Sequence, residues 1–266
     1  MGEILDAIER VKMSDLHEVY RVEQAKWDAQ ALAELEAIGV TSDRDFQQYA
    51  SHASTMRGIA DFLGDLRGKK VLEIGCGLGQ ISVLLAKSGA RVTAFDISPM
   101  SVVVARKRAR LNEVDDGVNL LVAAGERLPF GDESFDVVFG KGVLHHLEPS
   151  LGAPELYRVL KRGGKAAFSE PMGMNPVLKF ARAYLPYPDK NPRGADKPLS
   201  YREIREWGSR FSEFHVEEFQ LLSMIERGLG FHRPVPILRR ADDFLLKHVP
   251  FLRRFCRYVT LKMVKA

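Results

Sequence analysis

The feature that most constrains this chain is an apolar stretch that runs directly into closely spaced glycines. The segment Val71-Leu-Glu-Ile-Gly-Cys-Gly-Leu-Gly79 is followed by a helical pattern over Gln80–Lys87. Glycine lets a ligand approach the backbone where a Cβ would collide, and the free N–H groups and positive dipole end of the next helix point at that ligand. The stretch therefore predicts a strand, a ligand-binding turn and a helix.

The spacing of polar residues around this turn indicates the kind of ligand. A dinucleotide-binding turn has its third glycine where this chain has Gln80, and Gly79 gives a Gly-x-Gly-x-Gly spacing instead. Glu73 precedes the turn, where a carboxylate would repel a pyrophosphate but could hold an ammonium group. Asp96 ends the next apolar run, where a carboxylate can accept hydrogen bonds from both ribose hydroxyls. These positions favour a cationic cofactor with an amino-acid part.

From residue 70 onward, short runs rich in β-branched residues alternate with helical segments. The runs are KKVLEI, RVTAFD, NLLVAA, FDVVFG and KAAFSE, and the helical segments between them are 80–87, 99–112 and 155–160. This alternation predicts an α/β fold, a Rossmann-like parallel sheet with helices on both faces. Residues 214–222 and 258–264 alternate in polarity and could form a closing antiparallel hairpin.

The remaining segments have helical patterns or are rich in proline. We expect helices over 1–12 and 15–38, another that opens at Ser42 with Asp45 three residues later, a short helix over 177–184, and one from the capping box Ser200–Glu203 to Phe211. We divide the chain into an N-terminal helical lid, 1–68, and an α/β domain, 69–266. This domain carries insertions at 171–199 and 223–256, where loops placed over a rigid sheet confer specificity.

Composition excludes several classes of protein. With 266 residues, of which 45% are hydrophobic and 28% charged, the chain can bury a core without disulfide or metal staples. Cys76 and Cys256 have no metal-ligand spacing, which favours a reducing compartment, the cytoplasm. A net charge of +4 is too small to indicate nucleic-acid binding.

Six segments follow one another in an order that resembles a known family. They are VLEIGCGLGQ (71–80), FDIS (95–98), ERLPF (126–130), FDVV (135–138), GVLHHL (142–147) and ELYRVLKRGGK (155–165). Over about residues 71–171 the chain resembles the class I S-adenosylmethionine-dependent methyltransferases, in the small-molecule branch of ubiquinone and menaquinone methyltransferases known as methyltransferase type 11. The resemblance implies that S-adenosylmethionine is the cofactor and S-adenosylhomocysteine a product.

The resemblance also implies where the cofactor binds. It assigns this role to residues of the turn, the next strand end and two later loops: Glu73, Gly75, Cys76, Gly77, Gly79, Asp96, Ile97, Gly125, Glu126, Lys141 and Gly142. The first five hold the methionine and ribose part, Asp96 the ribose hydroxyls and Ile97 the adenine. Family members often have an Asp where this chain has Ala124, so we expect a backbone contact or Glu126 to replace it.

Methyl transfer from a sulfonium needs a dry, aligned pocket and no enzyme nucleophile. If the acceptor must lose a proton, the candidate bases are His146, His145 and Glu170, although the histidines could instead support the loop and the carboxylate could cap a turn. The stretch 139–141 has no carboxylate for a magnesium site, so we expect a metal-independent enzyme. Aromatic candidates for a lid over the cofactor, which could equally be core residues, are Tyr20, Trp27 and Tyr49.

We expect the acceptor to be a small hydrophobic molecule: a lipid, isoprenoid, polyketide, aromatic or quinone-like compound. The segment 244–255 mixes large apolar side chains with cations, which suits weak peripheral membrane contact, a cover over a lipid-like acceptor, or an amphipathic helix packed on the domain. Two alternatives stay open. One is a nucleic-acid methyltransferase that uses the basic C-terminal segment, and the other is a non-catalytic protein that binds the cofactor.

Overall fold

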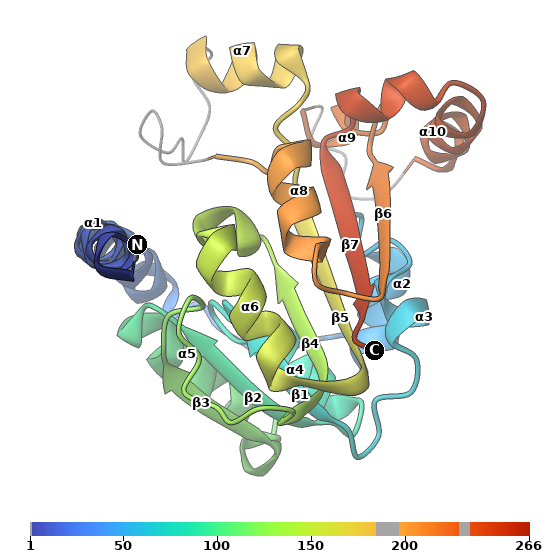
Figure 1. The fold of residues 1–266 in the computed structure, drawn as a ribbon. Helices are drawn as coiled ribbons and strands as arrows, with labels where there is room; N and C mark the ends of the chain where they lie inside the picture. The colour runs from blue at the N-terminus through green and yellow to red at the C-terminus, as the bar shows by residue number, and fades with distance from the viewer. Residues whose placement is uncertain (1, 185–196, 229–234) are drawn as a thin grey trace.

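The computed structural model describes residues 2–184, 197–228 and 235–266, which form one seven-stranded sheet with helices on both faces (Figure 1). The strand order is β3-β2-β1-β4-β5-β7-β6. The strands are β1 (Lys70–Ile74), β2 (Arg91–Asp96), β3 (Val118–Val122), β4 (Phe135–Lys141), β5 (Leu160–Pro171), β6 (Glu213–Phe219) and β7 (Tyr258–Val264).

The first five strands are parallel to one another, and the last two close the sheet as a hairpin. Strand β7 lies between β5 and β6 and is antiparallel to both, with Thr260 opposite Ser169 on one side and Glu217 on the other. The central strands are apolar nearly throughout because helices cover both of their faces. The predicted α/β fold with a closing antiparallel hairpin is confirmed.

The helices cover two separate halves of the core. They are α1 (Gly2–Glu34), α2 (Phe46–His52), α3 (Ile59–Leu63), α4 (Gln80–Lys87), α5 (Pro99–Leu111), α6 (Pro149–Val159), α7 (Pro176–Tyr184), α8 (Tyr201–Gly208), α9 (Ile225–Gly228) and α10 (Pro236–His248), with short 3₁₀-helices η1 (Asp115–Gly117), η2 (Leu144–His146) and η3 (Pro250–Phe255). On one face of the sheet, Leu156 of α6 and Trp207 of α8 pack into the core. On the other face, the core includes Phe46 of α2, Ile59 of α3 and Leu84 of α4.

Local chemistry explains several helix starts. Ser98 accepts the N–H of Ser101 and precedes Pro99, and Ser200 and Glu203 form the predicted capping box of α8. Three expectations were wrong. A single α1 replaces the helices over 1–12 and 15–38, and α2 begins after Asp45, whose side chain caps Gln48, rather than at Ser42. Helix α6 begins at Pro149 rather than at 155, because Glu148 caps its first turn and Pro154 is accommodated inside it.

Helix α1 docks on α5 through a side chain that caps the neighbouring helix. Asp28 accepts the hydroxyl of Ser98 at 2.5 Å and the N–H of Met100 at 3.0 Å, at the start of α5. Lys107 Nζ donates to the Leu35 carbonyl at 2.8 Å, and Ala31 is fully buried. These contacts fix where α1 crosses the carboxyl ends of the strands. The predicted division into a lid over 1–68 and a domain over 69–266 stays a prediction.

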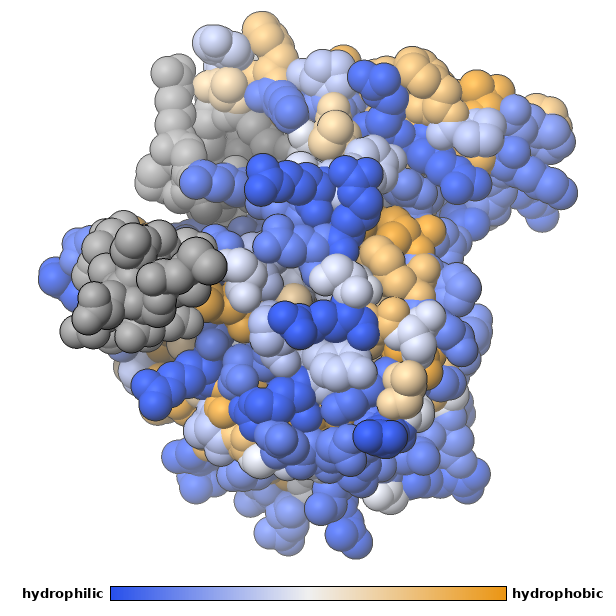
Figure 2. All heavy atoms as spheres, in the orientation of Figure 1, coloured by the Kyte–Doolittle hydropathy of each residue, from blue (hydrophilic) through white to orange (hydrophobic). Residues whose placement is uncertain are grey.

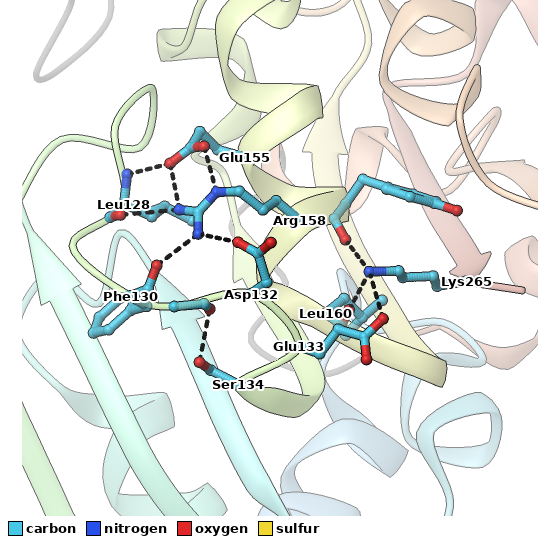
Figure 3. A network of polar contacts seen from close by, with 11 residues as sticks. Leu128, Phe130, Asp132, Glu133, Ser134, Glu155, Arg158, Leu160 and Lys265 are labelled. Atoms are coloured by element: carbon cyan, nitrogen blue, oxygen red, sulfur yellow. Dashed lines mark hydrogen bonds and ion pairs between the residues drawn. The ribbon is translucent and has the colours of Figure 1, made fainter.

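An arginine joins α6 to the connection between β3 and β4 (Figure 3). Arg158 makes two hydrogen bonds to Glu155 at 2.8 Å and donates to the carbonyls of Leu128 and Phe130 and to Asp132. Glu155 in turn accepts the N–H of Leu128 at 2.8 Å. The network holds the connection that carries residues 125 and 126 into the site described next.

Candidate active site

The glycine turn after β1 has the backbone that its sequence requires. Gly75, Gly77 and Gly79 all have left-handed φ, at +66°, +49° and +76°. A Cβ at Gly75 would lie 2.5 Å from Val143, and one at Gly79 would lie 2.7 Å from Ala105, whereas one at Gly77 would meet no atom within 4 Å. The turn is therefore held tightly at both ends and has open space at its middle.

This turn borders a cavity of about 220 Å³ at the carboxyl ends of the parallel strands. The predicted residues that line it are Tyr20, Trp27, Gly75, Gly77, Asp96, Ile97, Gly125, Glu126, Lys141, Gly142 and His146. Further lining residues that we did not predict include Val19, Glu23, Phe95, Ser101, Val143 and Leu147. The predicted residues Glu73, Cys76, Gly79, Tyr49, His145 and Glu170 do not line it.

Asp96 joins the turn to the next helix. Its carboxylate accepts the N–H of Gly77 at 2.8 Å and that of Ser98 at 3.0 Å, and only 8% of the residue is exposed. Burial raises the pKa of Asp96, although these backbone donors oppose the rise. A carboxylate on the cavity wall that already accepts backbone N–H groups is a preorganised acceptor for ligand hydroxyls.

Glu126 connects α1 to the opposite wall of the cavity. Its carboxylate accepts the Tyr20 hydroxyl at 2.6 Å and the N–H of Glu148 at 3.1 Å. Burial and the facing carboxylate raise the pKa of Tyr20, so its hydroxyl stays protonated and donates. Next to it, a Cβ at Gly125 would lie 2.6 Å from Leu147, which leaves no room for a side chain at that position.

Glu23 is a site residue that the sequence reasoning missed. Its carboxylate lies 3.6 Å from His146 Nδ1 and accepts the Trp27 indole N–H at 2.8 Å. Burial opposes ionisation of Glu23, but His146, Lys26 and Trp27 outweigh it and the pKa of Glu23 is lower than usual. The helical spacing of residues 20, 23 and 27 places them on one face, a signal by which Glu23 could have been found.

The three predicted catalytic residues divide into one on the cavity and two behind it. The Glu170 side chain is fully buried and accepts the N–H groups of Val143 and Leu144 at 2.9 and 3.0 Å, and it lies 2.8 Å from His145 Nδ1. These contacts hold the loop after β4 in the shape that turns His146 toward the cavity. The catalytic role of all three residues stays a prediction.

Glu73 lies behind the turn and not on the cavity. Ser82 of α4 donates to it at 2.5 Å, and burial raises the pKa of Glu73 to about 8. Lys141 lines the cavity and donates to the Tyr49 hydroxyl at 3.0 Å, which connects α2 to the end of β4. Within the described residues no three His, Cys, Asp or Glu side chains gather as metal ligands.

Comparison with known proteins identifies the domain that this cavity belongs to. A model of the methyltransferase domain family matches residues 72–168. This segment therefore corresponds to a methyltransferase domain. The matched segment runs from β1 to β5 and includes both the glycine turn and Asp96. The predicted family resemblance is confirmed.

Curated relatives match parts of this chain. A demethylmenaquinone methyltransferase of Chlorobaculum parvum is 40% identical over 124 residues, 46% of this chain and 48% of that protein. A phthiotriol/phenolphthiotriol dimycocerosates methyltransferase of Mycobacterium tuberculosis is 28% identical over 199 residues, 72% of this chain and 60% of that protein. The chain thus spans about half the length of the first of these relatives.

A solved structure shows the same fold. Geranyl diphosphate C-methyltransferase from Streptomyces coelicolor A3(2), solved with Mg²⁺, geranyl diphosphate and S-adenosyl-L-homocysteine, superposes with a TM-score of 0.58 at 19% identity. The superposition covers 77% of this chain and 76% of that one. At this identity the likeness bears on the fold alone.

Proposed function

We propose that this protein transfers the methyl group of S-adenosylmethionine by direct displacement to a small hydrophobic acceptor. The observation that carries the proposal is the cavity itself. It lies within a methyltransferase domain, and it combines an open glycine turn with a buried carboxylate at the end of β2.

The residues present fit this cofactor. The space beside Gly77 admits a ligand against the backbone, and Asp96 offers an ionic acceptor for ribose hydroxyls. Ile97, Gly125 and Glu126 supply an apolar wall with one carboxylate, which suits an adenine ring and its amino group. Lys141 and Gly142 close the end of β4, where we assign the methionyl part.

Cys76 and Gly79 support the proposed cofactor site through the backbone. Cys76 donates its N–H to the Phe95 carbonyl at 2.9 Å, which fixes the turn against β2. Gly79 begins α4 and cannot carry a side chain because Ala105 lies against it. Glu73 lies behind the turn with a raised pKa, and a cationic ligand in the turn would favour its ionised form through space.

Catalysis by this chain is a matter of alignment and proton transfer. The bound cofactor supplies an activated methyl group, so no protein nucleophile is required. His146 faces the cavity and would accept the proton of an acidic acceptor, with Glu23 stabilising the imidazolium that results. Tyr20 and Trp27 on α1 would exclude water from the cavity, and Tyr49 would hold Lys141.

We propose a quinone-like or lipid-like acceptor because two relatives are named for acceptors of these kinds. One is named for demethylmenaquinone and the other for phthiotriol dimycocerosates. Both free cysteines are buried, which fits a reducing location such as the cytoplasm, with 244–255 as a candidate for membrane contact. The expectation of a metal-independent reaction without nucleic acid stays part of the proposal.

The test is to incubate the purified full chain with methyl-labelled S-adenosylmethionine and cell extract, then to fractionate lipids, polar metabolites and nucleic acid. We expect label in the lipid fraction. Label only in nucleic acid would overturn the proposal in favour of the nucleic-acid alternative. Cofactor binding without label in any fraction would favour the non-catalytic alternative. The matched control is the Asp96→Asn variant, which should lose label in proportion to its weaker cofactor binding.

A further inference from the structure

Exposed apolar side chains are concentrated at one end of the molecule. Nine of the sixteen large hydrophobic side chains that are exposed in the described part of the chain lie between residues 177 and 251. They include all four exposed aromatic residues of that part: Phe180, Tyr184, Phe244 and Phe251. Figure 2 shows apolar surface beside hydrophilic surface at the end of the molecule that carries α7 and α10. Clusters of this kind mark interaction sites.

Helix α7 turns its apolar stripe away from the core. Val177, Phe180 and Tyr184 are spaced by three and four residues, so they share one helical face, and they are 70%, 58% and 66% exposed. The rings of Phe180 and Tyr184 lie 4.8 Å apart. A helix on a water-facing surface normally presents its polar side outward, so the exposure of this apolar stripe indicates an interaction surface.

Helix α10 alternates apolar and cationic side chains on its outer face. Ile237, Arg240, Phe244 and Lys247 follow one another at helical spacing and are all exposed. The inner face is anchored by Asp242, which is 1% exposed and accepts the N–H groups of three residues in the loop after β6. Asp242 therefore anchors α10 to the domain, and the position of the outer face is fixed.

The cations of this region have few acidic partners. Within the described residues Arg240 and Lys247 form no ion pair, and the exposed Asp243 is already paired with Arg57 at 2.5 Å. Arg254 of η3 lies 5.0 Å from the centre of the Phe251 ring, so cation and aromatic ring are presented together. The surface is positively charged as well as apolar.

A buried asparagine connects the start of α7 to the end of η3. The Asn175 side chain caps α7 by accepting the N–H of Val177 at 2.9 Å, and it donates to the Phe255 carbonyl at the end of η3 at 2.6 Å. Helix α7 follows the carboxyl end of β5 after a short connection (Figure 1). The cavity borders the carboxyl ends of the parallel strands as well.

We propose that α7, α10 and η3 together form a docking surface for an anionic lipid bilayer, here called the cap surface. Aromatic rings can enter the headgroup boundary while the arginines and lysines meet anionic headgroups. A second copy of this chain would bring the same cations face to face, which disfavours self-association through this surface. Among the described helices none is long and apolar enough to cross a bilayer, which agrees with a surface that lies on the membrane.

The purpose of the cap surface rests on the proposed function, since a bilayer-dissolved acceptor would then reach the enzyme beside its cavity. Its test does not, because vesicle binding requires no catalysis. We would measure co-sedimentation of the full chain with vesicles of phosphatidylcholine, alone or mixed with phosphatidylglycerol. We expect binding to the mixed vesicles that weakens as salt is added.

Two variants separate the apolar from the ionic contribution. Phe244→Ser with Phe251→Ser should weaken binding at least about tenfold through lost apolar burial. Arg240→Ala with Lys247→Ala should weaken it about tenfold to thirtyfold, since each cation near an anionic surface contributes about 1 kcal/mol. The matched control is Val103→Ser, which removes an exposed apolar side chain from α5 and should leave vesicle binding unchanged.

Three results would overturn the cap surface. They are equal binding to neutral and anionic vesicles, equal weakening by the Val103→Ser control, and a dimer that only the cap-surface variants dissociate. Calorimetry of S-adenosylmethionine binding on the same preparations separates this proposal from the proposed function. Intact cofactor binding with no vesicle binding refutes only the cap surface, and the reverse result refutes only the proposed function.

Discussion

Replacing Asp96 with asparagine should separate cofactor affinity from stability. The substitution keeps the size of the side chain but removes the charge that faces the cavity and accepts the N–H groups of Gly77 and Ser98. A hydrogen bond to a charged group contributes about 1.5–3 kcal/mol, and about 1.4 kcal/mol is tenfold in affinity. We therefore expect the Kd for S-adenosylmethionine to rise about tenfold to hundredfold.

Stability should respond differently. Burial raises the pKa of Asp96 in the folded state, so the ionised carboxylate lowers stability at pH values above the pKa of the unfolded chain, and asparagine removes that cost. The lost acceptor offsets this gain, so the free energy of unfolding at pH 7 should stay within about 1 kcal/mol of the wild-type value.

The assay is isothermal titration calorimetry combined with denaturant unfolding. The matched control is Asp116→Asn, the same change at an exposed position of η1. Wild-type affinity in Asp96→Asn would refute the assignment of this carboxylate to the cofactor. So would an equal loss of affinity in Asp96→Asn and Asp116→Asn.

Four further predictions follow from the site and the fold. Tyr20→Phe removes the 2.6 Å hydrogen bond between α1 and Glu126, so the rate constant of cofactor dissociation in stopped-flow measurements should rise at least about fivefold. An unchanged rate constant would contradict a closing role for α1. His146→Asn should lower kcat by about hundredfold or more and remove the acidic limb of the pH profile, whereas an unaltered profile would exclude it as the base. The ligand-free protein should lose stability as pH rises from about 4.5 to about 8, because Glu73 keeps its proton when folded and releases it when unfolded. In urea titrations Glu73→Gln should reduce this dependence of the unfolding free energy on pH, and an equal dependence in both proteins would refute the raised pKa. Arg158→Ala breaks the network of Figure 3 and should lower Tm by about 4–8 °C, whereas an unshifted Tm would mean that the network adds no stability.

Elements that depend on local chemistry could be predicted from the sequence. The helix Gln80–Lys87 and the strand Arg91–Asp96 have the bounds we expected, because glycines and a Ser-Pro pair mark their ends. The capping box at Ser200 likewise located α8. The order of the resembling segments was needed to interpret the turn as a methyltransferase feature, since a glycine-rich turn by itself fits several ligands.

Features that depend on contacts distant in sequence could not be predicted. Glu23 became a site residue only because α1 docks through Asp28 on α5, which brings it to His146, more than a hundred residues away. The start of α6 was predicted at 155 because Pro154 normally breaks a helix. In the structure Pro154 lies inside α6, and Leu156 of the same helix packs in the core. The separation of Glu170 from the cavity likewise depends on the fold of the loop after β4.

The most direct test of the central claim is a crystal structure of the full chain with S-adenosylhomocysteine. We expect the nucleoside to occupy the cavity between the glycine turn and α1, with its ribose hydroxyls hydrogen-bonded to Asp96 and its amino-acid part beside Gly75 and Gly77. An empty cavity at saturating ligand, or ribose hydroxyls bound away from Asp96, would contradict it.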